Sequence, residues 1–186
     1  VFPWATSLII QAGVWKFIID KDYGALNTLL LKLGLISSPV NWTPTPEAYF
    51  AWEIFVGIFV TVPFVTFCVL SGLQSIDNSY YEAATVDGAN YWQKLFKITL
   101  PLVKSSLTVS TVLNIIYVFN SFPIIWTITK GDPASRTDTL VTYLYKLAFY
   151  KGKSGEAAAV SVIGFLILCA CASVYMVVSL RKEEED

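Results

Sequence analysis

Long apolar runs alternate with short polar segments along the 186 residues of this chain. Three of the runs pass at least twenty positions without a charged residue. A helix of about twenty apolar residues crosses the hydrocarbon core of a bilayer, so each of these runs is long enough to be a transmembrane span. The first run of the chain holds Gln11 and Lys16, and Lys16 lies near its end, where a long side chain reaches the headgroups. The pattern predicts about four spans, at 1–19, 51–73, 107–129 and 157–180.

The composition supports a membrane protein and excludes several other classes. Hydrophobic residues make up 55% of the chain and charged residues 15%, whereas soluble domains carry about 25% charged residues. The net charge of −1 provides no basic surface for nucleic acid. Histidine is absent and the three cysteines fall inside apolar runs, so we expect neither a metal site nor a catalytic group.

One short motif suggests nucleotide binding but lacks a required residue. Gly152-Lys153-Ser154 is similar to the end of a phosphate-binding loop. That loop also needs a glycine five positions before Gly152, and position 147 is leucine. We therefore expect that this chain does not bind ATP by this device.

The polar segment at 77–101 has the sequence of two short helices joined by a turn. Asp77 or Asn78 is a suitable N-cap for the first helix, and Gly88 is able to end it in the left-handed conformation. Asn90 is a suitable N-cap for a second helix of about ten residues. Pro101 then sends the chain in a new direction. We predict a helix-turn-helix that lies in water and offers a docking surface.

The same segment carries a motif with several residue types at fixed spacing. Glu82-Ala83-Ala84 is followed by Gly88 and then by Ile98-Thr99-Leu100-Pro101. This pattern resembles the EAA loop of the integral-membrane permease subunits of binding-protein-dependent ABC importers. The tripeptide alone would fit an ordinary amphipathic connector, but agreement at seven positions over twenty residues favours the importer family.

The resemblance implies an all-α fold: a polytopic transmembrane helix bundle, with about four spans here and a cytoplasmic helix-turn-helix coupling loop at 77–101. It also implies a role for each motif residue. Glu82 would supply polar contacts to an ATPase subunit, and Asp87 is a common choice beside the motif. The small side chains of Ala83 and Ala84 would permit close packing, Gly88 would form the turn, and Pro101 would begin the return into the membrane.

The resemblance further implies the partners and the location. We expect cytoplasmic ATPase subunits, a second permease subunit of the same or a similar sequence, an extracytoplasmic solute-binding protein and membrane lipid. The location would be the inner (plasma) membrane of a bacterium or archaeon, crossed several times. The chain itself would be no enzyme and would bind no cofactor, because ATP and Mg would be used by the ATPase partner. Complete permeases commonly have six or more spans, so residues 1–186 are expected to form a single permease domain that lacks its N-terminal spans.

Charge counting does not establish the orientation of the chain. Five lysines and arginines lie on the side of the predicted coupling loop and the C-terminal tail, against seven on the other side. The positive-inside rule expects the excess in the cytoplasm. The cytoplasmic position of the coupling loop therefore rests on the resemblance.

A polar face within the third predicted span is the candidate solute path. Asn114, Tyr117, Asn120 and Ser121 follow one another at helical spacings of three or four. Amides in hydrocarbon need partners, so this face should point into the bundle. Two interpretations stay open. The face makes hydrogen bonds between helices, or it lines a path where amides bind sugar hydroxyls and Tyr117 or Trp126 stacks on a ring.

Three other residues within the spans are of interest. Pro63 and Pro123 each remove a backbone hydrogen bond and are expected to kink their helices. Glu53, beside Trp52, is interpreted as an anchor at the membrane interface. A contact between Glu53 and the binding protein or the solute is the alternative.

The substrate class rests on the segments that flank the motif. Trp15, Gly24, Asn27 and Trp42, together with 137–149, are most similar to permeases for sugars, oligosaccharides or glycerol phosphate. Permeases for polyamines, phosphate or other small solutes share the coupling loop and are the alternative. A passive channel or structural membrane subunit would not need that loop. An intramembrane enzyme would need paired acids, and Glu53 is the only acid within a predicted span.

Overall fold

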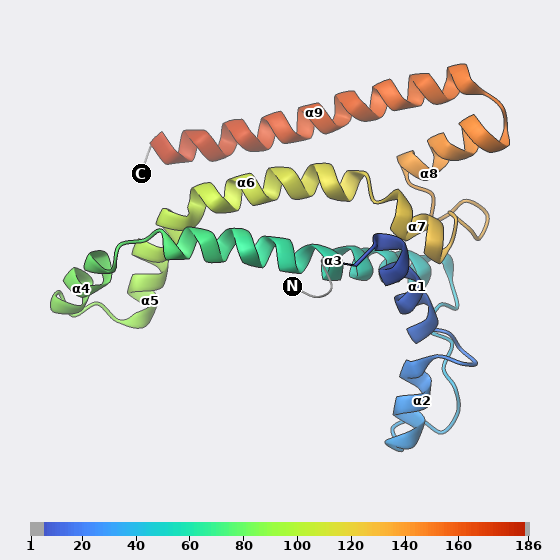
Figure 1. Cartoon of the computed structure of the whole chain (residues 1–186), viewed down its shortest axis with the longest axis horizontal. Helices are drawn as coiled ribbons and strands as arrows, with labels where there is room; N and C mark the ends of the chain where they lie inside the picture. Colours follow the sequence, from blue (N-terminus) through green and yellow to red (C-terminus); the bar gives the residue numbers. More distant parts are fainter. Residues whose placement is uncertain (1–5, 185–186) are drawn as a thin grey trace.

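The computed structural model describes the chain from residue 6 to residue 184, with side chains to residue 179. The described residues form helices, turns and loops and no strand, which confirms the predicted all-α fold (Figure 1). The elements in chain order are α1 (Leu8–Ile18), α2 (Ala25–Lys32), α3 (Pro46–Gln74), α4 (Asn78–Val86), α5 (Tyr91–Lys94), the π-helical turn η2 (Leu95–Thr99), α6 (Leu100–Phe119), α7 (Phe122–Ile128), α8 (Leu140–Tyr145), the π-helical turn η3 (Lys146–Tyr150) and α9 (Ser154–Glu184).

Three helices among the described residues are long and apolar enough to cross a membrane. They are α3, the continuous helix Tyr91–Phe119 that contains α5, η2 and α6, and the part of α9 at Ser154–Ser179. Helix α1 has 11 residues and is therefore about 16 Å long, against a hydrocarbon core of about 30 Å. Residues 1–5 of the predicted span 1–19 lie outside the described residues. The described part of the chain thus contains three such helices and one shorter apolar helix.

The third predicted span has different bounds in the structure. A continuous helix was expected over 107–129, but α6 ends at Phe119 and α7 begins at Phe122. Pro123 causes the break, because it has no N–H to donate to the carbonyl of Phe119. The N–H groups of Ile124 and Ile125 bond to the carbonyl of Ser121 instead, at 3.1 and 3.4 Å. Asn120 and Ser121 therefore lie in the gap between two helices.

Pro101 acts differently from the prediction. The second helix of the loop was expected to end before Pro101, but helical structure continues through it into α6. The π-helical turn η2 ends at Thr99, two residues before this proline, and such turns accommodate an interrupted ladder of hydrogen bonds. The axis bends strongly between α5 and α6 (Figure 1). The predicted change of direction is correct, and the predicted helix end is wrong.

Helix α6 lies between α3 and α9 (Figure 1). Close contact with α3 depends on Gly72, where an added Cβ would lie 2.6 Å from Ser106 Oγ and 2.9 Å from Ser106 Cβ. On the other side, the hydroxyl groups of Thr108 and Ser179 form a hydrogen bond between α6 and α9. Small and hydroxylated residues thus set the helix contacts, as is usual where lipid removes the hydrophobic drive for association.

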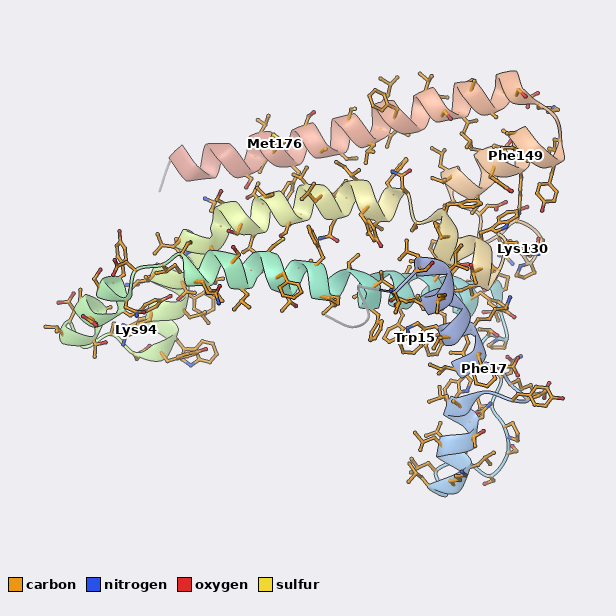
Figure 2. All side chains as sticks on the ribbon, viewed as in Figure 1. Trp15, Phe17, Lys94, Lys130, Phe149 and Met176 are labelled. Atoms are coloured by element: carbon orange, nitrogen blue, oxygen red, sulfur yellow. The ribbon has the colours of Figure 1, made fainter. Side chains whose placement is uncertain are left out.

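The end of the molecule opposite α4 and α5 is built by α1, α2, α7 and α8 (Figure 1). Its core consists of Ala12 from α1, Val56 and Val60 from α3, and Ile124 and Ile128 from α7. Trp15 packs on this core and meets the ring of Phe55 edge to face, with centroids 5.0 Å apart (Figure 2). This core fixes α7 against α3 beyond the gap at Asn120 and Ser121.

The close contact at Gly72 predicts a specific loss of stability. Gly72→Ala should lower the free energy of unfolding by about 1–3 kcal/mol, because the methyl group overpacks the contact with Ser106. Gly57→Ala on the same helix meets open space and should change stability by less than about 1 kcal/mol. Thermal unfolding of the purified protein in detergent measures both, and Ser106→Gly should restore part of the loss. Equal midpoints for the two alanine variants would contradict the assigned contact.

Candidate functional site

Both helices of the coupling loop begin with a hydrogen-bonded cap. The carboxylate of Asp77 accepts a hydrogen bond from the N–H of Ser79 at 2.8 Å, and this bond lowers the pKa of Asp77 below its ordinary value. At α5, Asn90 Oδ1 accepts from the N–H of Gln93 at 2.9 Å, and Gln93 Oε1 accepts from the N–H of Asn90 at 2.8 Å. This reciprocal pair is a capping box. The structure thus places N-caps at Asp77 and Asn90.

Gly88 ends α4 in the left-handed conformation, with φ of +73°. The N–H of Ala89 bonds to the carbonyl of Ala84 at 2.9 Å, and the N–H of Gly88 bonds to that of Thr85 at 3.1 Å. These two bonds form a Schellman motif, which satisfies carbonyls that the helix end leaves free. An added Cβ would meet open space, so the backbone conformation alone requires glycine here.

Two side-chain bonds hold the helices of the coupling loop together. Lys94 (Figure 2) donates from Nζ to Thr85 Oγ1 at 2.7 Å across the turn. The hydroxyl groups of Tyr81 and Thr99 lie 3.0 Å apart. The motif residues Glu82, Ala83, Asp87, Gly88 and Pro101 are exposed, and Ala84 is half-buried. The loop is therefore a braced projection whose motif residues are available to a partner.

The loop also exposes apolar side chains that the sequence motif does not include. Val86 is 89% exposed, Tyr91 is 71% exposed and Trp92 is 64% exposed. The ring of Trp92 stacks on that of Phe96, with centroids 6.2 Å apart. Exposed aromatic residues are enriched at protein interfaces. These exposed side chains could have been identified from the sequence, because aromatic residues are unusual in a segment that is expected to lie in water.

A groove between α3 and α6, here called the α3–α6 groove, holds three adjoining cavities. The first cavity, of about 430 Å³, lies at mid-length and is lined by Val60, Thr61, Phe64, Leu113, Asn114, Ile116, Tyr117 and Asn120. The second, of about 250 Å³, lies toward α7. The third, of about 700 Å³, lies toward the coupling loop.

The three cavities follow one another along the whole bilayer-crossing length of α3. Thr61 and Tyr117 line both the first and the second cavity, and Phe64 lines the first and the third. The lining on α3 runs from Phe50 to Ser71. At 1.5 Å per residue this is about 30 Å, which matches the thickness of the hydrocarbon core. The groove is thus long enough to form one wall of a path across the membrane.

The structure brings the four predicted path residues to this groove. Asn114, Tyr117 and Asn120 line the first cavity, and Ser121 lines the second, where Tyr117 also contributes. The amide groups of Asn114 and Asn120 donate to the backbone carbonyls of Ser110 and Ile116, both in α6. Each observed amide hydrogen bond therefore goes to a carbonyl four residues earlier in the chain and not to another helix.

A buried polar network lies at the α7 end of the groove. Glu53 is 5% exposed, and its Oε1 accepts a hydrogen bond from Thr129 Oγ1 at 2.6 Å. Thr129 Oγ1 lies 2.9 Å from Thr137 Oγ1. Close by along the chain, Lys146 Nζ bonds to Asp138 at 3.0 Å. The network links α3 to α7 and to the loop before α8.

The interpretation of Glu53 as an interfacial anchor is wrong, because its side chain is buried beside α7 instead of reaching the headgroups. The network joins residues far apart in the sequence. The one feature of the sequence that indicated this network was Glu53, an isolated acid near the start of a long apolar run.

Residues 2–182 match the model of the family described as "Binding-protein-dependent transport system inner membrane component". The chain belongs to this family. With its apolar helices, this inner membrane component is a multi-pass membrane protein. The helix-turn-helix between α3 and α6 carries the motif that suggested the family.

Named relatives of this inner membrane component are transport proteins. A "Probable ABC transporter permease protein" of Brucella suis biovar 1 (strain 1330) is 48% identical over 184 residues, which cover 99% of this chain and 64% of the relative. The "Trehalose/maltose transport system permease protein MalF" of Thermococcus litoralis is 36% identical over 184 residues, covering 99% of this chain and 61% of the relative. The chain therefore spans less than two thirds of the length of these relatives.

A solved structure has the same arrangement of helices. The match is to a chain in the "Crystal structure of bacterial alginate ABC transporter in complex with alginate pentasaccharide-bound periplasmic protein". The TM-score is 0.84 at 25% identity, over 97% of this chain and 62% of that chain. The fold of the described helices is thus that of an ABC transporter membrane subunit.

The buried network predicts a strict requirement for glycine at position 131. Gly131 has φ of +83°, and an added Cβ would collide with the carboxylate of Asp138 and lie 2.7 Å from Lys146 Nζ. Gly131→Ala should lower the free energy of unfolding by about 2–4 kcal/mol, from backbone strain and displacement of the ion pair. Gly152→Ala, with φ of +64° and open space, carries the strain alone, at about 1 kcal/mol. Equal thermal midpoints for the two variants would refute the collision.

Proposed function

We propose that the chain is a transmembrane permease subunit of an ATP-driven importer for a sugar or oligosaccharide delivered by an extracytoplasmic binding protein. One observation carries the proposal. The coupling loop joins the same two helices, α3 and α6, whose facing surfaces line the groove. A partner that moves the loop therefore moves both walls of the groove. The named relatives and the alginate transporter support a sugar-type solute.

The mechanism divides the work between this chain and its partners. A cytoplasmic ATPase pair binds ATP with Mg and hydrolyses it, and this chain is not an enzyme. The exposed motif residues and the aromatic side chains of the loop dock in a groove on the ATPase. Closure of the ATPase pair then tilts α3 and α6 as rigid bodies, because the caps and cross-bonds of the loop keep its two helices together. This is alternating access, with the coupling free energy passing through one docking element.

The solute passes along the α3–α6 groove in this proposal. The open side of the groove is closed by a second permease subunit, of the same or a similar sequence, in the inner membrane of a bacterium or archaeon. Asn114 and Asn120 offer amide oxygens to hydroxyl groups, and Tyr117 and Phe64 offer aromatic faces to a ring. Cavities with a few polar groups among apolar walls are typical of small-molecule sites.

Uptake by the complete importer in proteoliposomes tests the proposal. Maltose and trehalose serve as sugar probes, with spermidine and phosphate as alternative solutes, each supplied with the matching binding protein. We expect ATP-dependent uptake of a sugar and ATPase stimulation by the sugar-loaded binding protein. Uptake of spermidine or phosphate alone would contradict a sugar permease, and uptake without ATP would indicate a passive channel.

Variants of the coupling loop should separate ATP hydrolysis from transport. Gly88→Val forces a branched side chain into a left-handed backbone, and Ala84→Asp places a charge where Ala84 is half-buried. Both should reduce uptake by at least about tenfold while the partner ATPase retains its hydrolysis. Gly152→Val is the matched control, since Gly152 also has a positive φ and open space but lies outside the coupling loop, between η3 and α9. Wild-type uptake by either loop variant would rule out the coupling role.

A variant in the first cavity should affect solute affinity alone. Asn114→Leu removes an amide from the lining and should raise the KM for the sugar about fivefold to tenfold, which is the usual worth of one such hydrogen bond. Thr66→Val on α3 changes a polar residue whose hydroxyl bonds to its own helix and which does not line the groove. Its KM should stay within about twofold of wild type. A similar KM for both variants would show that Asn114 does not bind the solute.

A further inference from the structure

The second cavity contains an acidic side chain for which the coupling mechanism has no use. Among the described residues that line this cavity, only Glu53 is charged. The rest of the lining is apolar except for the hydroxyl groups of Thr61, Ser121, Thr139 and Tyr117. Carboxylates are rarely buried without a partner, and those that are buried within membrane spans commonly serve a function.

One of the two carboxylate oxygens of Glu53 has no hydrogen-bond partner among the described residues. Oε1 accepts the hydrogen bond from Thr129 at 2.6 Å. Oε2 is also buried, and none of the described residues donates a hydrogen bond to it. Leaving a buried charged acceptor unsatisfied costs free energy, which a ligand with a suitable donor would recover.

The charges around the second cavity restrict the kind of ligand. None of the described residues that line the second cavity is a lysine or arginine, and Lys146, next to this end of the chain's polar network, lies 3.0 Å from both carboxylate oxygens of Asp138. The site therefore keeps an acceptor without a compensating positive charge. Such a site accepts hydrogen bonds from hydroxyl groups and disfavours an anionic solute.

We infer that Glu53 is a solute-binding residue that forms a second subsite, where its carboxylate accepts hydrogen bonds from the hydroxyl groups of a neutral sugar. This inference rests on the proposed function. Glu53 precedes Thr61 of the first cavity by eight residues of α3, or about 12 Å. Because the two cavities adjoin and share Thr61 and Tyr117, one solute that reaches from Asn114 to Glu53 is longer than a single sugar ring. The structure thus points to a neutral disaccharide or short oligosaccharide.

The test uses the complete importer in proteoliposomes, with maltose and trehalose as probes and the KM for uptake as the readout. Glu53→Leu keeps the bulk of the side chain and removes the acceptor, so its KM should rise at least about tenfold. The matched control is Glu47→Leu, the same change on the same helix at an exposed residue whose partner is Arg136. Its KM should stay within about twofold of wild type. An equal KM for the two variants would overturn the inference.

Two more variants distinguish solute binding from a structural role. Glu53→Gln keeps an acceptor oxygen without the charge and should restore the KM to within about threefold of wild type. Thr129→Val removes the bond to Oε1 and leaves Oε2 available to the solute. It should therefore lower the thermal midpoint while raising the KM less than Glu53→Leu does. A KM as high in Glu53→Gln as in Glu53→Leu would mean that the charge itself is needed, as for a cationic solute, and would overturn the neutral sugar. An equal rise in KM for Thr129→Val and Glu53→Leu would mean that Glu53 has only a structural role, and would overturn the inference.

Failure of the inference is distinguishable from failure of the proposed function. If the wild-type importer takes up a sugar and Glu53→Leu leaves its KM unchanged, the inference alone fails. If the wild-type importer takes up no sugar while spermidine or phosphate is transported, the proposed substrate class fails and the inference fails with it. Sugar-free ATPase activity in each variant shows that the complex is assembled.

Discussion

The close packing of α3 against α6 at Gly72 is the contact on which the other features depend. An added methyl group would lie within 2.9 Å of two atoms of Ser106, so the helices meet at near-backbone distance. This contact lies beside the coupling loop, at the end of both helices. From it the helices continue as the two walls of the groove toward α7. One tight contact therefore lies both at the base of the loop and at the loop end of the groove.

Hydrogen bonds within the coupling loop hold its two short helices together as one unit. Caps at Asp77 and Asn90 and the turn at Gly88 satisfy the helix ends locally. Bonds from Lys94 to Thr85 and from Tyr81 to Thr99 join the two short helices. In the proposed mechanism, a force on this unit passes to α3 and α6 with little local deformation. The far end is held by the core of α1, α3 and α7 and by the Glu53–Thr129 bond.

Local features of this fold were predictable from the sequence, and long-range ones were not. The caps and the turn at Gly88 depend on residues within a few positions, so their residue types identify them. The break at Asn120 followed from Pro123, although a continuous span was expected over 107–129. Continued helix through Pro101 depends on the π-helical turn before it, which has no simple sequence signal. The bond between Glu53 and Thr129 joins residues 76 positions apart, and no spacing rule brings them together.

The central claim is that the loop and the groove move as one unit, and labelling of a cysteine in the groove tests it most directly. Thr61→Cys is placed in a protein whose Cys68, Cys169 and Cys171 are replaced by serine, and its reaction rate with a small thiol reagent is measured in the assembled importer with and without ATP. The account predicts that ATP changes this rate severalfold with the native loop and leaves it unchanged when Gly88→Val is added. An ATP-dependent change of equal size in both proteins would contradict it.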